Sequence, residues 1–341
     1  MNTLPFVSII MPVRNEAAYI DRSLGAVLAQ DYPAERLEIL VVDGLSDDGT
    51  RAIIQAYQAQ HGRVRLLDNP ARIVAPALNL ALARARGDVI VRVDGHCEIA
   101  PDYVRNCVTH LRATGVAGVG GPIETVGETF TAQAIALAMS AWFGVGGSAF
   151  RTVKDRPMLV ETIAFPAYTR RALARAGRFD EELVRNQDDE YNYRLLKLGE
   201  KLLLAPDVRS RYYSRGAVRK LWGQYFQYGF WKVRVLQKHP RQMRGRQFAP
   251  PLFAATLLLG LLFPPLLALT LLAYTLANGA AALALGRRHG WRYAPLLLLI
   301  HPTLHLSYGL GFLVGLARFG GRWGSDTAVI QPLWQEGTCY E

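Results

Sequence analysis

Two long stretches without a charged side chain constrain this chain more than any other feature of its sequence. Residues 249–286 and 293–317 contain no Lys, Arg, Asp or Glu. About 20 consecutive apolar residues are enough to cross a bilayer as a helix, so a purely soluble protein is disfavoured. Pro264 and Pro265 should break the first stretch into a helical hairpin, because proline removes a helix hydrogen-bond donor. We therefore expect a C-terminal transmembrane or re-entrant helical region of about three segments.

The net charge of the 341-residue chain is +11, and most of it lies directly before these stretches. Between Pro206 and Gln247 there are eleven Lys or Arg and one acid, a net charge of +10 (11 − 1). Eight aromatic residues lie between Tyr212 and Trp231 in the same segment. This pattern predicts one or two amphipathic helices at a membrane surface, with membrane lipids as partners. A buried packing helix is the alternative, and the position of the segment disfavours nucleic acid as a partner.

The N-terminus and the cysteines indicate which side of the membrane the remainder occupies. The opening sequence MNTLPFVSIIMPV lacks the basic region, long apolar core and cleavage site of a signal peptide. Cys97, Cys107 and Cys339 are too few and too sparse for a disulfide framework. We expect a multi-pass protein of the inner (cytoplasmic) membrane whose N-terminal part lies in the cytoplasm.

The N-terminal part alternates between short apolar runs and helical patterns. The apolar runs predict strands at residues 6–11, 37–42, 64–67 and 89–93. Helical patterns fall at residues 16–30, 50–60 and 75–85, and later at 181–198. The alternation predicts an α/β fold: a Rossmann-like, mostly parallel sheet with helices on both faces. A further strand is expected within residues 159–168.

Composition divides the chain into four parts. They are a catalytic domain at residues 1–205, a basic aromatic interface region at 206–247, the membrane helices at 248–320 and a tail at 321–341.

Polar residues follow the predicted strands at the end where such sheets bind ligands. The segment 14–16 follows the first strand, Asp43 follows the second, and Asp94 and His96 follow the fourth. Asp94 and His96 are both suitable ligands for one divalent cation, and such an ion would neutralise a diphosphate leaving group. A turn aspartate beside a surface histidine is the alternative.

A second acidic group begins the last predicted helix of this region. Asp188, Asp189 and Glu190 exceed what the helix N-terminus needs electrostatically. A carboxylate that faces a cleft suits a general base for an acceptor hydroxyl. A solvated acidic helix start is the alternative interpretation. In the basic segment, Arg215 and Arg219 are candidates for binding an acceptor pyrophosphate.

Together these segments resemble glycosyltransferase family 2, the inverting nucleotide-sugar enzymes of GT-A fold. The resemblance covers about residues 5–235, and the matching segments occur in the family's order. They are VSIIMPVRNE (7–16), VVDGLSDDGT (41–50), RVDGHCEIAPDY (92–103) and RNQDDEYNYRLLKLGEKL (185–202). The motifs NPARIVAPALNLAL, VDGH and NQDDE are most similar to those of membrane-associated bacterial exopolysaccharide glycosyltransferases of the succinoglycan type.

The resemblance implies a role for each matching residue. Asp94 and His96 would bind Mg²⁺ or Mn²⁺ and the diphosphate, and Asp43 would contact the nucleotide base. Alignment through Arg194-Leu195 places the general base at Asp188, with Asp189 as the second choice. The nucleotide-sugar site would comprise Pro12, Val13, Arg14, Glu16, Asp43, Arg72 and Asp94. The acceptor or pyrophosphate site would comprise Arg215, Arg219, Trp222 and Gln224.

The resemblance also predicts the reaction. A hexose, with UDP-glucose as the expected donor, would pass to a polyprenyl-diphosphate-linked or other lipid-linked acceptor for exopolysaccharide or another surface glycan. The Gln-x-x-Arg-Trp motif of processive synthases is replaced here by Gln224-Tyr-Phe-Gln-Tyr228, so one sugar per acceptor is expected. A processive polysaccharide synthase and an inactive membrane scaffold with a transferase-like domain remain the alternatives.

Overall fold

The computed structural model describes residues 4–214, 216–323 and 332–334. Its contacts divide the chain into two compact units. Of the described residues, the first unit, here called the sheet unit, comprises 4–124, 153–212 and 332–334, and the second, the helical unit, comprises 125–152, 213–214 and 216–323. Residues 125–152 were expected within a continuous domain ending at 205. They group with the helical unit because Gln133 accepts a hydrogen bond from Tyr293, and the Phe143 carbonyl lies 2.9 Å from His305 Nε2.

The sheet unit is built on an eight-stranded sheet of order β3-β2-β1-β4-β9-β6-β10-β8. Strand β1 pairs in parallel with β2 on one side and β4 on the other, and β2 pairs in parallel with β3. Beyond β4, β9 and β8 run antiparallel to their neighbours, and β6 pairs in parallel with β10. The strand bounds are β1 Val7–Val13, β2 Leu37–Asp43, β3 Val64–Asp68, β4 Val89–Arg92, β6 Gly118–Gly120, β8 Met158–Val160, β9 Ala167–Thr169 and β10 Leu202–Leu204.

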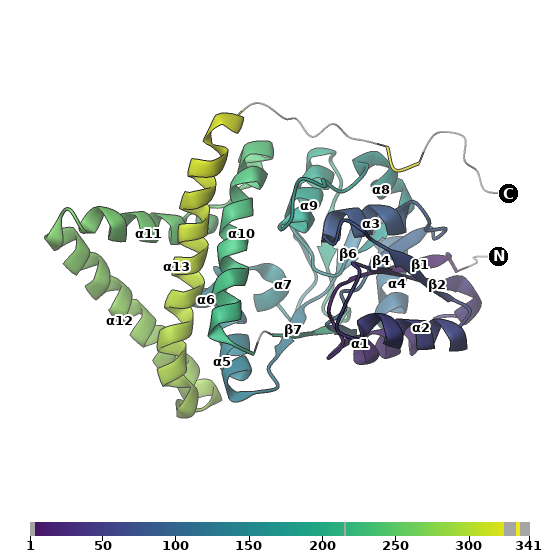
Figure 1. The fold of residues 1–341 in the computed structure, drawn as a ribbon, viewed down its shortest axis with the longest axis horizontal. Coiled ribbons are helices and arrows are strands. Elements are labelled where there is room, and N and C mark those ends of the chain that lie inside the picture. Colours follow the sequence, from purple (N-terminus) through teal and green to yellow (C-terminus); the bar gives the residue numbers. More distant parts are fainter. Residues whose placement is uncertain (1–3, 215, 324–331, 335–341) are drawn as a thin grey trace. The chain divides into compact units, whose positions relative to one another are not determined.

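Helices cover both faces of this sheet, as the alternating pattern predicts. One face packs against α3, α8 and α9, whose apolar residues form one core with Ile10, Leu40 and Ile90. Figure 1 shows α1 and α2 on the opposite face. The mostly parallel α/β sheet is therefore confirmed. The helix bounds are α1 Ile20–Leu28, α2 Thr50–Gln60, α3 Val74–Leu82, α4 Tyr103–Thr114, α8 Arg170–Ala176 and α9 Gln187–Lys197.

Three expected elements differ from the structure. The first helix begins at Ile20 and not at residue 16, because Asn15 has a left-handed φ of 54° and the chain turns there. The single strand expected at 159–168 is two strands, β8 and β9, interrupted where Phe165 has a φ of 46°. The last helix of this region begins at Gln187 and not at residue 181, directly after Asn186 at a φ of 62°.

A second, three-stranded sheet has the order β5-β11-β7. Its strands are β5 Cys97–Ile99, β7 Ile123–Val126 and β11 Ser210–Tyr213, and β11 runs antiparallel to β5. Cys97 and Cys107 are both buried and free, as expected for a chain without a disulfide framework. Burial raises the pKa of both thiols, so they behave as apolar packing groups. Cys339 lies outside the described residues.

The helical unit contains the apolar C-terminal segments. Two of its helical stretches, Pro264–His289 and Trp291–Arg322, are long and apolar enough to cross a membrane, by length and composition. The expected break is present: α11 ends at Gly260, and Pro264 begins α12, where its missing N–H costs nothing. The helix bounds are α5 Phe130–Met139, α6 Trp142–Val145, α7 Ala149–Thr152, α10 Val218–Lys238, α11 Ala249–Gly260, α12 Pro264–His289 and α13 Ala294–Phe319.

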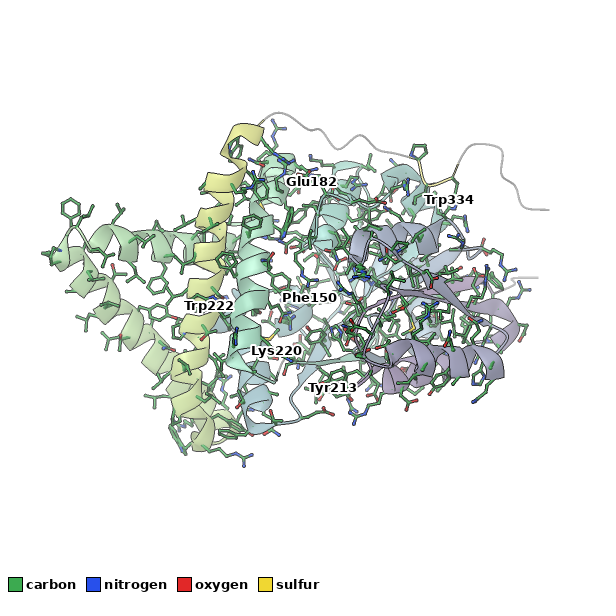
Figure 2. All side chains as sticks on the ribbon, in the orientation of Figure 1. Phe150, Glu182, Tyr213, Lys220, Trp222 and Trp334 are labelled. Atoms are coloured by element: carbon green, nitrogen blue, oxygen red, sulfur yellow. The ribbon has the colours of Figure 1, made fainter. Side chains whose placement is uncertain are left out.

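Within the basic aromatic segment, Ser210–Tyr213 form strand β11 and Val218–Lys238 form helix α10, one side of which packs on α13. Val233 is buried there with Phe312 and Phe319. The helix also keeps an exposed side that includes Lys220 and Trp222 (Figure 2). The packing interpretation therefore holds for one side of α10, and its placement at a membrane surface stays a prediction.

Glycine is required where α13 meets α10. A Cβ atom added at Gly311 would lie 2.1 Å from the carbonyl oxygen of Phe226, whereas one added at Gly279 on α12 would meet nothing within 4 Å. We expect Gly311→Ala to force the two helices apart and to lower the melting temperature in detergent. Gly279→Ala, the matched control, should leave it unchanged or raise it, because alanine is the better helix former by about 1 kcal/mol. Equal effects of the two substitutions would contradict the close helix contact.

Candidate active site

The predicted site residues that follow β1, β2 and β4 lie at the carboxyl-terminal edge of the parallel strands. Register places Val13 of β1 beside Asp43 of β2, and β4 ends at Arg92, beside Ile10. The strand order reverses direction at β1, with β2 and β3 to one side and β4 to the other. In open α/β sheets this switch point is where ligands bind.

Glu16 and His96 connect the loops that follow β1 and β4. The Nδ1 atom of His96 lies 2.7 Å from Oε1 of Glu16. Because an ionised carboxylate only accepts hydrogen bonds, Nδ1 is the donor in this contact, and Nε2 is the ring nitrogen that Glu16 does not engage. Gly95 permits the approach, since a Cβ atom there would lie 2.9 Å from Cγ of Glu16 and 3.1 Å from Cγ1 of Val13.

Asp43 is buried, and its carboxylate organises the turn that follows β2. Its Oδ1 accepts a hydrogen bond of 2.5 Å from the Ser46 hydroxyl, and its Oδ2 lies 3.1 Å from the Ser46 backbone nitrogen. Arg51 bridges Oδ2 of Asp43 at 3.2 Å and Asp68 at 2.6 Å. The carboxylate therefore already has hydrogen-bonding and ionic partners within the turn.

Two exposed arginines stand on neighbouring loops at the same edge. The Nη1 atom of Arg14 donates to the carbonyl oxygen of Arg72 at 3.3 Å. Arg72 itself has a left-handed φ of 61°. Non-glycine residues with positive φ are uncommon and gather at functional sites, where the surrounding structure compensates their strain. The five described ones lie in loops of the sheet unit: Asn15, Leu45, Arg72, Phe165 and Asn186.

The acidic start of α9 divides into three different environments. The carboxylate of Asp188 pairs with the guanidinium of Arg92. Asp189 accepts a hydrogen bond of 3.0 Å from the Thr162 hydroxyl. Glu190 is buried and pairs with Arg194 one turn further along the helix. The three neighbours in sequence are therefore not interchangeable.

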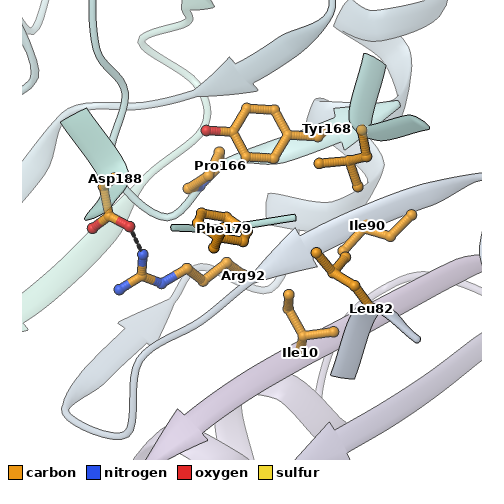
Figure 3. A pocket seen from close by; sticks show the side chains of 9 residues that line it. Ile10, Leu82, Ile90, Arg92, Pro166, Tyr168, Phe179 and Asp188 are labelled. Carbon is orange, nitrogen blue, oxygen red and sulfur yellow. Dashed lines mark hydrogen bonds and ion pairs between the residues drawn. The ribbon is translucent and has the colours of Figure 1, made fainter. Parts of the chain in front are cut away.

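Arg92 joins Asp94 to Asp188. Its Nε lies 2.9 Å from Oδ1 of Asp94 and its Nη2 lies 3.3 Å from Oδ2, while Nη1 pairs with Asp188 (Figure 3). No role was predicted for Arg92 from sequence. The available signal was its position: a charged residue at the end of an otherwise apolar buried strand must be paired.

A second group that sequence reasoning missed lies behind Asp189. The Tyr168 hydroxyl donates to Oδ1 of Asn192 at 2.5 Å, and Nδ2 of Asn192 lies 3.0 Å from Oγ1 of Thr162. Burial raises the pKa of Tyr168, which keeps its hydroxyl protonated as the donor. These hydrogen bonds connect α9 to β9 and to the segment that precedes β9.

Three of the four predicted acceptor-binding residues are described, and they belong to the helical unit. Arg219 and Trp222 are exposed on α10, and Gln224 Nε2 donates to the Tyr228 hydroxyl at 2.9 Å. Arg215 lies outside the described residues.

The predicted metal ligands fit a divalent cation that shares its coordination with a substrate. Asp94 supplies carboxylate oxygens on a side chain that is 21% exposed, and His96 supplies a ring nitrogen oriented by Glu16. No group of three or more His, Cys, Asp or Glu residues suited to a metal occurs among the described residues. Mg²⁺ commonly binds through one or two carboxylates together with phosphate oxygens and water, so two protein ligands suffice.

Comparison with known proteins identifies the class that this sheet and site define. The family model described as "Glycosyl transferase family 2" matches residues 8–177. Succinoglycan biosynthesis protein ExoA of Rhizobium meliloti is 30% identical over 92% of this chain and 96% of its own length. The chain belongs to glycosyltransferase family 2, and it is a glycosyltransferase related to ExoA.

Two further comparisons concern another relative and the fold. A dolichyl N-acetyl-alpha-D-glucosaminyl phosphate 3-beta-D-2,3-diacetamido-2,3-dideoxy-beta-D-glucuronosyltransferase of Methanococcus voltae is 32% identical over 68% of this chain and 74% of its own. The solved mannosyltransferase PcManGT of Pyrobaculum calidifontis, in complex with GDP-Man and Mn²⁺, superposes with a TM-score of 0.57. It is 23% identical, with 95% of this chain and 89% of that chain covered. The GT-A-like fold is thereby established.

The division of the acidic cluster can be tested by stability. Arg194 also donates to the carbonyl oxygens of Ala176 and Arg178, so Arg194→Met removes the ion-pair partner of the buried Glu190 together with these two hydrogen bonds. We expect a loss of about 3–5 kcal/mol in the free energy of unfolding, measured as a lower melting temperature. The control Arg178→Met removes a surface pair with Glu181 and should cost about 0–1 kcal/mol. Equal losses would show that Glu190 does not need Arg194.

Proposed function

We propose that the protein is an inverting, non-processive hexosyltransferase that extends a lipid-linked acceptor during synthesis of exopolysaccharide or another surface glycan. UDP-glucose is the donor that we propose. The observation that carries the proposal is the meeting of Asp188 with Asp94, through Arg92, at the switch point of the sheet. A candidate base and a candidate leaving-group site then lie on one edge, as a single displacement requires.

Two relatives support a lipid-linked acceptor and a surface glycan. The name of ExoA places it in succinoglycan biosynthesis. The name of the Methanococcus voltae relative specifies a dolichyl-linked sugar phosphate. The apolar helices α12 and α13 suit an enzyme that meets such an acceptor at a membrane. We therefore propose a multi-pass inner-membrane protein, with the sheet unit in the cytoplasm where nucleotide sugars are made.

Asp188 is the general base in this proposal. Its side chain is 41% exposed, so an acceptor hydroxyl has access to its carboxylate. Asp189 instead accepts a hydrogen bond from the Thr162 hydroxyl. Because that carboxylate already has a protein donor, Asp189 is the weaker candidate for the base. Asp188 takes the proton of the acceptor hydroxyl, and the oxygen attacks the anomeric carbon from the face opposite the leaving group. The configuration at that carbon is inverted.

The donor's diphosphate lies in this proposal between the loops that follow β1, β3 and β4. Arg14 and Arg72 are exposed cations that can bind its oxygens. Asp94 and His96 would hold a Mg²⁺ or Mn²⁺ ion, which supplies positive charge for the departing nucleoside diphosphate. The Pyrobaculum mannosyltransferase, solved in complex with GDP-Man and Mn²⁺, supports this chemistry.

The nucleoside occupies the loop of residues 12–16 in this proposal. Pro12 and Val13 are the last residues of β1, and their backbone would line the nucleoside site. Glu16 would act indirectly, through its contact with His96. Asp43 contributes by holding the following turn in place. A direct contact of its carboxylate with the base would compete with the hydrogen bonds that Ser46 donates to Asp43.

Single transfer is supported by α10. Gln224 pairs with Tyr228 within the helix, in the stretch where processive synthases carry Gln-x-x-Arg-Trp. Arg219 and Trp222 are exposed and are proposed to bind the acceptor's pyrophosphate and lipid, together with Arg215. A product one hexose longer than the acceptor is the expected outcome.

The test is release of nucleoside diphosphate by the full-length protein in detergent. UDP-glucose, UDP-GlcNAc and GDP-mannose are offered with Mg²⁺ or Mn²⁺ and a polyprenyl-diphosphate-linked sugar, and the product is weighed by mass spectrometry. We expect Asp188→Asn to slow transfer about 10²–10⁴-fold, the usual contribution of a general base, with donor affinity within a few-fold of wild type.

Asp189→Asn is the matched control, because the same acid-to-amide change occurs one residue away and the amide oxygen can still accept from Thr162. It should retain most of the activity. The reverse pattern would move the base to Asp189. Absence of nucleotide binding in the wild type would remove the transferase proposal.

Glu16 is expected to act on metal affinity through His96. Loss of a carboxylate that orients a ligating histidine typically costs about 10–100-fold in metal affinity. We predict that Glu16→Gln weakens Mn²⁺ binding in the presence of UDP by this factor, measured by electron paramagnetic resonance. Asp31→Asn removes a surface carboxylate paired with Arg105 and should leave Mn²⁺ affinity unchanged. Equal Mn²⁺ affinities for Glu16→Gln and wild type would show that Glu16 does not contribute to metal binding.

A further inference from the structure

Arg92 is a buried cation whose two partners lie nearer the surface. Its side chain is 8% exposed, whereas those of Asp94 and Asp188 are 21% and 41% exposed. A pairing that only stabilised the fold would not need both carboxylates at the substrate edge. The cation is therefore buried, and both of its carboxylate partners are more accessible to solvent.

The surroundings of Arg92 make these contacts strong. Figure 3 shows its guanidinium directed at Asp188, with apolar side chains behind it. Electrostatic attraction is stronger beside such groups than in water, because they polarise little. The cavity there has a volume of only about 10 Å³, room for one water molecule at most, so no sugar can enter behind the ion pair. The apolar lining comprises Ile10, Leu82, Ile90, Pro166, Tyr168, Leu173 and Phe179.

The guanidinium also relates the two carboxylates to each other. Arginine is planar and presents its N–H groups in a rigid fork. Nε and Nη2 are both committed to Asp94, so the direction of Nη1, and with it the carboxylate of Asp188, is set by Asp94. These two acids are far apart in sequence and come from the end of β4 and the start of α9. Arg92 is the described side chain that contacts both.

We propose that Arg92 is the positioning residue of the transfer step and that it couples the donor site to the base. This inference rests on the proposed function. Asp94 holds Arg92 in place, Arg92 orients Asp188 toward the acceptor hydroxyl, and Arg92 does not itself bind the donor. Removal of the guanidinium should therefore slow transfer while leaving donor affinity nearly unchanged.

The test compares Arg92→Gln, Arg92→Lys, Asp188→Asn and the double variant Arg92→Gln/Asp188→Asn in the full-length protein. Donor affinity is measured by calorimetry with UDP-glucose and Mn²⁺, and transfer by single turnover. We expect Arg92→Gln to slow transfer about 10²-fold, as misplacement of a reacting group by about 1 Å does, with the donor Kd within a few-fold of wild type. Arg92→Lys should recover part of the rate, since a lysine keeps the charge and loses the fork.

The double variant distinguishes positioning from an independent role. If Arg92 acts only through Asp188, the double variant is no slower than Asp188→Asn alone. Multiplying losses, or a donor Kd weakened as much as the rate, would overturn the proposal and make Arg92 a donor-binding cation. Should Arg92→Gln not fold, Arg92→Lys with and without Asp188→Asn gives the same comparison. The control Arg105→Gln breaks the surface pair with Asp31 and should change neither rate nor Kd.

Failure of the proposed function gives a different result. A wild-type protein that binds no nucleotide, seen as no rise in melting temperature with UDP, GDP and Mn²⁺, would remove the transferase proposal, and with it the role of Arg92. A wild-type protein that binds and transfers, beside multiplying losses in the double variant, would remove only the role of Arg92.

Discussion

Parallel pairing of β1 with β2 and β4 is the constraint on which the site depends. These three strands are buried almost throughout their length, so polar side chains are admitted chiefly where the strands end. Parallel direction brings those ends to one edge, and the strand order changes direction at β1, the position where open α/β sheets bind ligands. Glu16, Asp43 and Asp94 thus share one edge although no short-range signal brings them together.

Charge at this edge is arranged by depth. Arg92 and Asp43 lie deeper and are fully engaged with partners, whereas Arg14, Arg72 and Asp188 are more exposed. Buried charges without partners are costly, so Arg92 and Asp43 must each be paired with groups of the protein itself. The outer groups remain accessible to a diphosphate and an acceptor. The same sequence segment can therefore hold one structural acid, Glu190, beside one proposed catalytic acid.

Much of the fold could be predicted because its signals are local. The helix at residues 50–60 and the strands at 37–42 and 64–67 follow from periodicity and turn residues, and the structure agrees within a residue. The start of α1 could not be predicted this way, because Asn15 turns the chain in order to form the site loop. Nor could the grouping of residues 125–152 with the helical unit, which depends on contacts such as that between Gln133 and Tyr293.

The candidate site follows from the sequence in its residue types and not in its pairings. Asp94, His96 and Asp188 follow from strand ends and a helix start, but each has a partner that the sequence does not specify. The arginine in Val-Ile-Val-Arg shows how far such reasoning extends: a cation at the end of a buried apolar strand must meet an acid. Asp94, two residues on, is the obvious acid. That Asp188 is the other depends on where α9 begins, and hence on the left-handed turn at Asn186.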